Sequence, residues 1–333
     1  MARANFKDIA KLAGVGTATV ERVLNGRGGV RPAMMEKVIV AARTLEYPRT
    51  LLDPHRGLLR VEVLMVRPET TFYNRLSKAF ARIAASLDPL VVVQRNFADE
   101  LNPAEIARRI RATEPRRAAL ILAVPNSREV EKAVEDVAAH GIPVIHVVTR
   151  ASPSIGEFVG IDNEAAGRSA ALFMSSMSRH PGRVVVLCHP IYQVHRDRVR
   201  GFSEFLDRHP GDLWFERVCF GRDEETTSAR MLSEVLSTEP GITGVYNVGG
   251  ANAALIKVLR HHPGGRNIFF VGHELTDYTA DALREGVMDV VLDQAPEAQA
   301  RRALDLALRR IGLLEIEPDK SPIRFITVTA ESI

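Results

Sequence analysis

Three histidines in the second half of the chain are the side chains whose chemistry could be catalytic or metal-binding. His189, His195 and His273 follow no ligand spacing typical of zinc, and no Glu or Cys accompanies them suitably. The two cysteines, Cys188 and Cys219, have neither the number nor the spacing of a disulfide framework. We therefore interpret the histidines as loop residues and the cysteines as reduced thiols of a hydrophobic core.

A second motif that could do chemistry is the glycine pair Gly249-Gly250, which precedes a helical segment. The run GGANAA lacks the lysine of a phosphate-binding P-loop and the spacing of a dinucleotide-binding turn. It is better interpreted as a tight connection between a strand and a helix. No pair of nucleophile and base stands out elsewhere, so the sequence predicts a protein that is not an enzyme and carries no cofactor.

Positive charge is concentrated at the start of the chain. The 333 residues carry a net charge of only +3, whereas the first 60 hold 11 Lys and Arg against 5 Asp and Glu. A cationic head suits a polyanion, because contacts with phosphates release counterions; a solvated basic surface is the alternative. The N-terminus lacks the apolar run of a secretory signal, and no later stretch approaches the roughly 18 apolar residues of a membrane span. A cytoplasmic protein without a membrane partner is expected.

The elements that must position these cations are three short helices. Apolar residues recur at helical spacing over 6–13, and the run stops at Gly14, which can adopt the left-handed conformation of a helix end. A second helix is expected from Thr17 to about Asn25, and a third over 32–45. Helices this short must pack on one another.

The turn between the first two helices is the most specific feature of this segment. Gly14-Val15-Gly16 joins two short helices, with Ala10 small enough for a close crossing, which matches a helix-turn-helix. The run FKDIAKLAGVGTATVERVLNGRGGVRPAMMEKVIVAARTLEYP resembles the headpiece of the LacI/GalR family of transcription regulators, above all in the spacing of AGV, TV, RVLN and EKV. The resemblance implies a small all-α helix-turn-helix domain over 1–47 that binds double-stranded DNA.

The resemblance also implies which side chains of the second helix meet the DNA. Base-reading positions fall on Thr17, Ala18 and Arg22, and positions that steady the helix or touch phosphates fall on Thr19 and Asn25. An arginine can reach O6 and N7 of a guanine together, whereas an alanine offers only a small apolar contact. We therefore expect the reading to depend most on Arg22, with a phosphate or solvent contact as the alternative role.

The linker over 48–60, PRTLLDPHRGLLR, departs from the family. Relatives commonly form a short helix here on operator binding and insert a leucine into the minor groove. Pro54 removes an amide donor and biases the residue before it away from helical angles, and Gly57 lies in the same stretch, so a full hinge helix is not expected. Its leucines are interpreted as hydrophobic anchors, and Arg49 as a candidate phosphate contact.

From residue 61 to 333 the chain alternates β-type apolar runs with helix-length amphipathic segments. The runs form two series, 61–66, 90–94, 118–124 and 143–148, then 183–188, 214–220, 244–248, 267–272 and 288–293. Continuous apolar strands separated by helices indicate parallel sheets covered on both faces. Two such series predict two α/β lobes.

This stretch resembles the two-lobed type I periplasmic-binding-protein fold, in its ribose-binding-like branch, which LacI/GalR proteins use as an effector domain. The resemblance assigns about 61–161 and 294–322 to the first lobe and about 163–291 to the second. It returns the last strand, 323–328, to the first lobe. The effector domain is thus expected to occupy 61–333.

The effector is expected in the loops that follow the strands, because ligands of open parallel sheets bind beyond the carboxyl ends of the strands. The resemblance places there two aromatic rings and several polar groups: Phe72, Tyr73, Arg150, Arg196, Asn247, Glu274 and Gln294. Arg198 competes with Arg196, and Glu274 stands where relatives carry aspartate. Polar groups from two lobes suit a hydroxyl-rich ligand, with a carboxylate or phosphate held by the arginines as the alternative.

These features together predict a sequence-specific DNA-binding repressor whose operator affinity is controlled by a sugar, polyol or sugar derivative. A near-palindromic operator needs two headpieces, which implies a homodimer formed through the body. Two other classes stay open. A sugar-binding protein without DNA-linked regulation would leave the headpiece unexplained, and an enzyme would need reactive groups that the sequence does not show.

Overall fold

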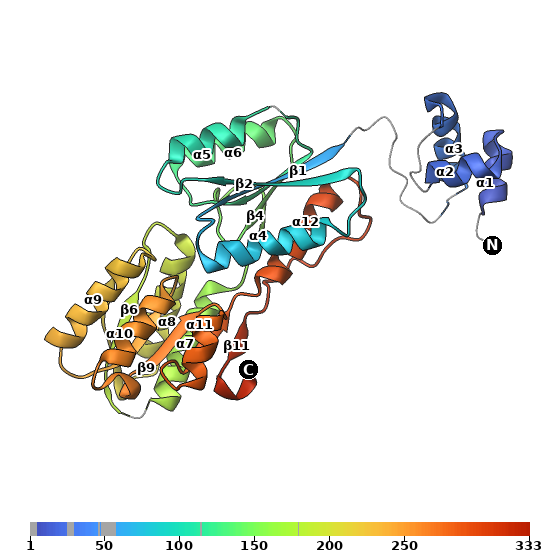
Figure 1. Ribbon diagram of the computed structural model, residues 1–333. Coiled ribbons are helices and arrows are strands. Elements are labelled where there is room, and N and C mark those ends of the chain that lie inside the picture. Colours follow the sequence, from blue (N-terminus) through green and yellow to red (C-terminus); the bar gives the residue numbers. More distant parts are fainter. Residues whose placement is uncertain (1–4, 25–29, 46, 48–57, 114, 179) are drawn as a thin grey trace.

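The computed structural model describes residues 5–24, 30–45, 47, 58–113, 115–178 and 180–333. It contains a small helical unit and two α/β lobes (Figure 1), as predicted. Within these ranges no helix has the length and apolar content needed to cross a membrane. The linker prediction for 48–57 and the candidate DNA contacts Asn25 and Arg49 lie outside the described residues.

The helical unit consists of α1 (Phe6–Ala13), α2 (Thr17–Leu24) and α3 (Pro32–Thr44). Asn5 caps α1, since its side chain accepts hydrogen bonds from two amides of the first turn. Gly14 ends the helix in the left-handed conformation, with φ at +67°, which lets the chain turn at once into α2. The three helices close over one small core that includes Ile9, Val20, Leu24, Val38 and Ala42.

The first lobe is a parallel sheet with helices on both faces. Its strands lie in the order β2-β1-β3-β4-β5, with bounds Val91–Ala98, Leu59–Val66, Ala119–Ala123, Val144–Val147 and Glu157–Val159. Helices α5 and α6 cover one face (Pro103–Arg111 and Arg128–Ala139), and α4 and α12 cover the other (Thr71–Ala84 and Pro296–Arg310). Strand β3 is buried throughout, as the continuous apolar run predicts.

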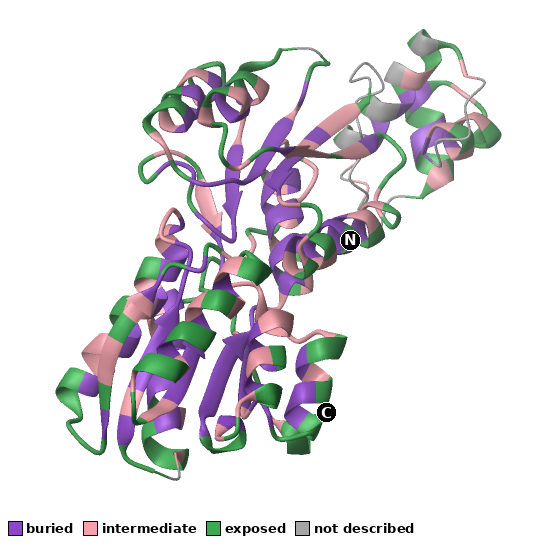
Figure 2. Cartoon of the chain, turned by 60° about the vertical axis from the view of Figure 1, so that its left-hand side comes forward, coloured by how far each residue is buried: buried purple, intermediate pink, exposed green. Residues whose placement is uncertain are grey.

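The second lobe repeats this plan with six strands in the order β11-β10-β9-β8-β6-β7. Their bounds are Ile326–Val328, Val290–Asp293, Phe269–His273, Ile242–Asn247, Gly182–Leu187 and Leu213–Cys219. Helices α7 and α8 pack together (Asn163–Met177 and Gln193–Arg208), and α10 packs against both α9 and α11 (Asn252–His261, Glu225–Thr238 and Asp277–Arg284). Short 3-10 turns occupy Gly265–Asn267 and Ala330–Ser332. Figure 2 shows the buried residues concentrated along the strands of both sheets.

The prediction that 323–328 returns to the first lobe is wrong. Strand β11 instead pairs antiparallel with β10 of the second lobe, where Val328 lies opposite Val291. This strand covers what would otherwise be the open edge of β10, whose unpaired amide and carbonyl groups need partners. Only Ile323, in an isolated bridge to Ile161, pairs with the segment that leaves the first lobe.

The chain passes between the lobes three times. It leaves β5 for α7, leaves β10 for α12, and returns from α12 to β11. Since the strands preceding each lobe's loops are parallel, their carboxyl ends in both lobes face the gap that these crossings span. The residues best placed for a ligand therefore lie between the lobes.

Candidate functional site

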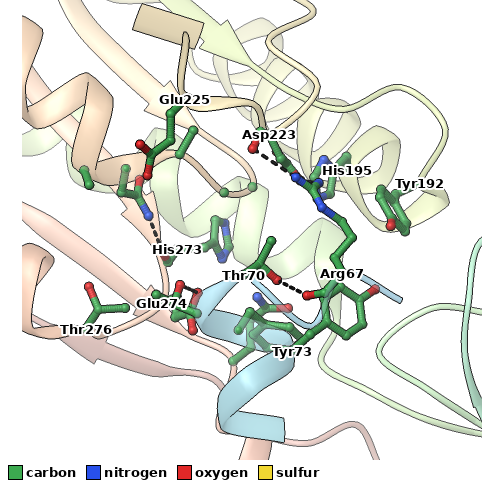
Figure 3. Close-up of a pocket in the computed structure, with 18 of the residues that line it drawn as sticks. Arg67, Thr70, Tyr73, Tyr192, His195, Asp223, Glu225, His273, Glu274 and Thr276 are labelled. Carbon is green, nitrogen blue, oxygen red and sulfur yellow. Dashed lines mark hydrogen bonds and ion pairs between the residues drawn. The ribbon is translucent and has the colours of Figure 1, made fainter. Parts of the chain in front are cut away.

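A cavity of about 390 Å³ lies between the two lobes (Figure 3). This volume is in the range that small-molecule sites occupy. The first lobe contributes lining residues that include Arg67, Thr70, Thr71, Phe72, Tyr73 and Val148. The second lobe and the crossing into α12 contribute others, including Tyr192, His195, Arg198, Asp223, Asn252, His273, Glu274 and Gln294.

The backbone around this cavity is strained. In the described chain seven residues other than glycine have positive φ, and five of them line the cavity: Arg67, Val148, Asp223, Ala251 and Glu274. The other two, Arg222 and Ala295, directly adjoin lining residues. Such conformations cost on the order of 1 kcal/mol each and persist only where the surrounding structure holds them, typically at binding sites.

Arg67 connects the two lobes across the cavity. Its guanidinium donates to the Asp223 carboxylate at 3.4 Å and to the Asp223 carbonyl at 3.1 Å, and its Nε lies 3.6 Å from Glu100. Tyr192, from the second lobe, donates to the same Glu100. Figure 3 shows Arg67 extended toward Asp223 and His195, so the lobes are joined by ionic contacts on this side of the cavity.

A second set of contacts joins the lobes through Glu274. Thr71 donates to Oε2 of Glu274 at 3.0 Å, while Oε1 has no hydrogen-bond partner and lies 4.0 Å from Arg75. Arg75 itself bonds to Asp293 at 2.6 Å. Burial, which leaves Glu274 only 6% exposed, raises the pKa of this carboxyl to about 8. At neutral pH the side chain is therefore mostly protonated and can donate as well as accept a hydrogen bond.

Arg198 is the most deeply buried polar group of the site, with 1% of its surface exposed. It donates to Asn163 at 2.8 Å, to the carbonyl of Val248 at 2.5 Å and to Gln294 at 2.6 Å. All three acceptors are neutral, and burial lowers the pKa of Arg198 to about 10, which leaves it charged at neutral pH. One side chain thus ties α7, the end of β8 and the crossing into α12 together.

Two glycines bring α7 and α8 close enough for these bonds. A Cβ on Gly167 would lie 2.0 Å from the Arg198 carbonyl oxygen, and a Cβ on Gly201 would lie 2.1 Å from that of Glu164. No larger residue fits either position without moving a backbone. The close crossing sets the depth at which Arg198 meets Asn163.

The structure brings together part of the predicted effector set. Phe72, Tyr73, Glu274 and Gln294 line the cavity. Asn247 lies behind it, where its amide donates to the Gly250 carbonyl and to Asn252 and so holds the loop after β8. These four lining residues come from both lobes and from a crossing between them.

Two predicted effector residues, Arg150 and Arg196, lie outside the cavity lining. Arg150 is exposed, and its guanidinium lies 4.5 Å above the Phe158 ring. Arg196 is exposed and donates to neighbouring groups of its own helix start. The reason is helical register: two residues along α8 turn the side chain by about 200°, so Arg198 faces the cavity and Arg196 faces solvent. The buried spacing Val194-Arg198-Phe202 is the sequence signal that identifies the inward face.

The loop interpretation of the histidines is wrong for two of them. His195 lies on α8 and His273 ends β9, and both line the cavity. Burial lowers the pKa of His195 to about 4 and that of His273 well below its ordinary value, so both are neutral near pH 7. Among the described residues no group of His, Cys, Asp and Glu is arranged to hold a metal ion. These histidines offer the ligand neutral hydrogen-bonding groups.

The headpiece presents the predicted reading face. Val20 and Leu24 of α2 are buried in the small core, which turns Thr17, Ala18 and Arg22 outward, where all three are exposed. Thr19 is half-buried beside them. The second helix of the motif therefore has the free surface that insertion into a major groove requires.

A helix-turn-helix unit joined to a two-lobed receptor with an internal cavity defines a DNA-binding protein that carries its own small-molecule sensor. Residues 5–49 match the family described as bacterial regulatory proteins, lacI family, and residues 61–312 match the periplasmic binding protein domain. The chain belongs to the lacI family of bacterial regulatory proteins, with a periplasmic binding protein domain as its receptor. The resemblance inferred from the sequence is thereby confirmed, and the chain is a ligand-regulated transcriptional regulator.

Individual relatives are distant. The HTH-type transcriptional regulator MalR of Clostridium butyricum is 22% identical over 255 residues, which cover 73% of each chain. A periplasmic solute-binding protein of Actinobacillus succinogenes 130z, solved with D-allose, is 17% identical with a TM-score of 0.72, over 82% of this chain and 98% of that one. A solute-binding protein of Agrobacterium vitis, solved with alpha-D-tagatopyranose, is 19% identical with a TM-score of 0.73, over 82% and 95%. At these identities the solved structures show the fold alone.

The state of Glu274 has a measurable consequence for stability. Its pKa lies near 4.5 ordinarily and about 8 in the folded chain, so folding takes up a proton and the stability it contributes is lost as pH rises toward 8. Between pH 6.5 and 8 we expect this group alone to lower the free energy of unfolding by about 1.5 kcal/mol. Denaturant unfolding of Glu274→Gln should lack this part of the pH dependence. Parallel curves for variant and wild type over that window would contradict the assignment.

Proposed function

We propose that this regulator is a repressor released from its operator by an uncharged sugar, polyol or sugar derivative bound between the lobes. The observation that carries the proposal is the cavity itself, which combines two aromatic rings with buried hydrogen-bonding groups from both lobes. Phe72 and Tyr73 pack edge to face with ring centroids 5.5 Å apart at one wall. An aromatic face suits the apolar face of a sugar ring, and the polar groups suit its hydroxyls.

The charges of the cavity favour an uncharged ligand over an anion. The described lining holds five carboxyl groups, those of Glu69, Asp223, Glu224, Glu225 and Glu274, against two guanidinium groups. Arg67 is already bound by Asp223 and Glu100, and Arg198 by three neutral acceptors. An anion would have to displace these partners and pass the acidic residues at the mouth. Arg150 and Arg196, which could have held a carboxylate or phosphate, lie outside the lining.

The solved relatives agree with a carbohydrate ligand, since the two proteins named above were solved with D-allose and with alpha-D-tagatopyranose. We assign the chain no enzymatic role, because both matched families are described as regulators or binding domains. Since its target is chromosomal DNA, we place the protein in the cytoplasm.

Regulation would follow from differential binding to two arrangements of the lobes. The contacts Arg67–Asp223, Thr71–Glu274 and Arg75–Asp293 all cross the cavity, so a ligand among them changes the energy of closure. We propose that the protein is a homodimer on a near-palindromic operator and that closure changes the spacing of its two headpieces. Arg22, Thr17 and Ala18 would read bases in each half-site.

A thermal-unfolding screen of the full chain tests the ligand class. Neutral aldoses, ketoses and polyols should include a compound that raises the unfolding midpoint by about 5 °C at 100 times its Kd, because binding at that excess stabilises the folded state by about 2.7 kcal/mol. The matched uronic acids and sugar phosphates should leave the midpoint unchanged. The compound found should then release the protein from a genomic fragment that it selects. A midpoint raised only by acidic or phosphorylated sugars would overturn the proposed ligand, and a ligand without any effect on DNA binding would favour a plain sugar-binding protein.

A further inference from the structure

The first lobe has an edge that must face the headpiece. The chain enters the body at β1, whose first residue is Leu59. Because the sheet is parallel, the amino ends of all its strands lie at this same edge, opposite the cavity. The segments that precede β3 and β4 lie there, and so do the ends of α5 and α12, which run back from the other edge.

This edge carries an excess of arginine. Two adjoining hollows, which share Arg111, Ala112 and Thr113, open on it. Their described lining includes His140 and seven arginines, Arg60, Arg108, Arg109, Arg111, Arg116, Arg117 and Arg310, with Asp136 as the one carboxylate among the described lining residues. We call these lining arginines the amino-edge surface.

Part of this charge is neutralised by carboxylates around the hollows. Ion pairs join Arg111 to Asp136 at 2.6 Å, Arg109 to Glu105 and Arg117 to Glu62 at 2.8 Å, and Arg310 to Glu157 at 2.6 Å.

Three arginines of the amino-edge surface remain available. Arg60, Arg108 and Arg116 have no carboxylate within ion-pair distance among the residues that the structure describes. Arg108 and Arg116 are exposed, and Arg60 donates to the neutral side chain of Gln94. Exposed cations spread along an edge suit an extended polyanion better than one small anion, which needs donors converging on a point.

We propose that the amino-edge surface binds phosphates of the duplex that flanks each operator half-site, with Arg108 and Arg116 as its contacts. The ten residues 48–57 can span at most about 40 Å between Tyr47 of the headpiece and Leu58 of the body. A docked headpiece therefore keeps this edge within reach of DNA, whereas the second lobe lies beyond it (Figure 1). The receptor then adds affinity that carries no sequence information, because phosphate contacts are the same along any duplex.

The test compares the full chain with Arg108→Ala/Arg116→Ala on a genomic fragment that the protein itself selects. Each lost phosphate contact should lower the slope of log affinity against log salt by about 0.9, so by about 1.8 for each protomer. Affinity at low salt should fall about tenfold and the loss should shrink as salt rises. On a duplex trimmed to the two half-sites, the variant and the wild type should bind alike.

Two further variants keep the test decisive. Arg208→Ala/Arg230→Ala removes two exposed arginines of the second lobe and should leave the salt slope unchanged. Arg108→Lys/Arg116→Lys keeps both charges and should keep the slope, since a phosphate is attracted by charge. A slope for the alanine variant equal to that of the second-lobe control overturns the proposal. So does an unfolding midpoint that inorganic phosphate raises in wild type alone while the slope is unchanged, because the hollows would then hold a small anion.

Discussion

Replacing Arg198 with methionine should abolish the effector's control of operator binding and lower the free energy of unfolding by about 3 kcal/mol. The methionine fills much of the volume but leaves Asn163, Gln294 and the Val248 carbonyl without their buried donor. These groups belong to one lobe and to the crossing that leads into the other. Without the arginine, ligand binding is no longer coupled to the arrangement of the lobes.

The matched control for this change is Arg196→Met, two residues earlier on the same helix. Arg196 is exposed and outside the cavity lining, so we expect a change within about 0.5 kcal/mol and a normal response. Denaturant unfolding, together with operator binding measured with and without the effector, compares the two. Arg198→Lys separates function from folding, because a lysine keeps the charge but cannot bond to three acceptors in fixed directions. A full response in Arg198→Met, in a folded protein, would remove this residue from the site.

Arg22→Ala should reduce affinity for the selected operator by roughly 10- to 100-fold for each half-site and leave binding to random duplex nearly unchanged. A bidentate contact of arginine with guanine contributes about 1–3 kcal/mol of discrimination. The side chain is exposed on α2, so its removal disturbs no packing of the headpiece core. Fluorescence anisotropy at one fixed salt concentration, on operator and on random duplex, gives the ratio directly.

Lys11→Ala supplies the comparison for this prediction. Lys11 is an exposed cation on α1, outside the reading helix, and its loss should affect operator and random duplex to the same small extent. If Arg22→Ala weakened both duplexes equally, as expected of Lys11→Ala, Arg22 would be a phosphate contact and the base reading would rest on Thr17 and Ala18.

Much of this fold could be predicted because its signals are local. Continuous apolar runs identify the buried strands β1, β3 and β8, and the turn at Gly14 marks the end of α1. The last strand was misplaced because the pattern of 323–328 satisfies either sheet edge equally. Which edge it joins depends on where β10 lies open, and that is a property of the assembled lobe.

The site was predicted only in part, because its contacts join residues that are far apart in sequence. Arg67 and Asp223 are separated by 156 residues, and neither strand end shows in the sequence that the other faces it. The left-handed conformations at these two positions are equally invisible, since neither residue type favours them. Arg198 is the exception. The helical period of α8 contains the information that it, and not Arg196, points inward.

The three crossings between the lobes have a consequence for the modularity of this regulator. No single cut divides the receptor into its lobes, because α12 packs in the first lobe while the strands before and after it, β10 and β11, pair in the second. The headpiece, by contrast, is attached through one short segment. Chimaeras that exchange the sensor of one regulator for that of another therefore have a natural junction at 48–60, and the receptor itself is inherited or lost as a whole.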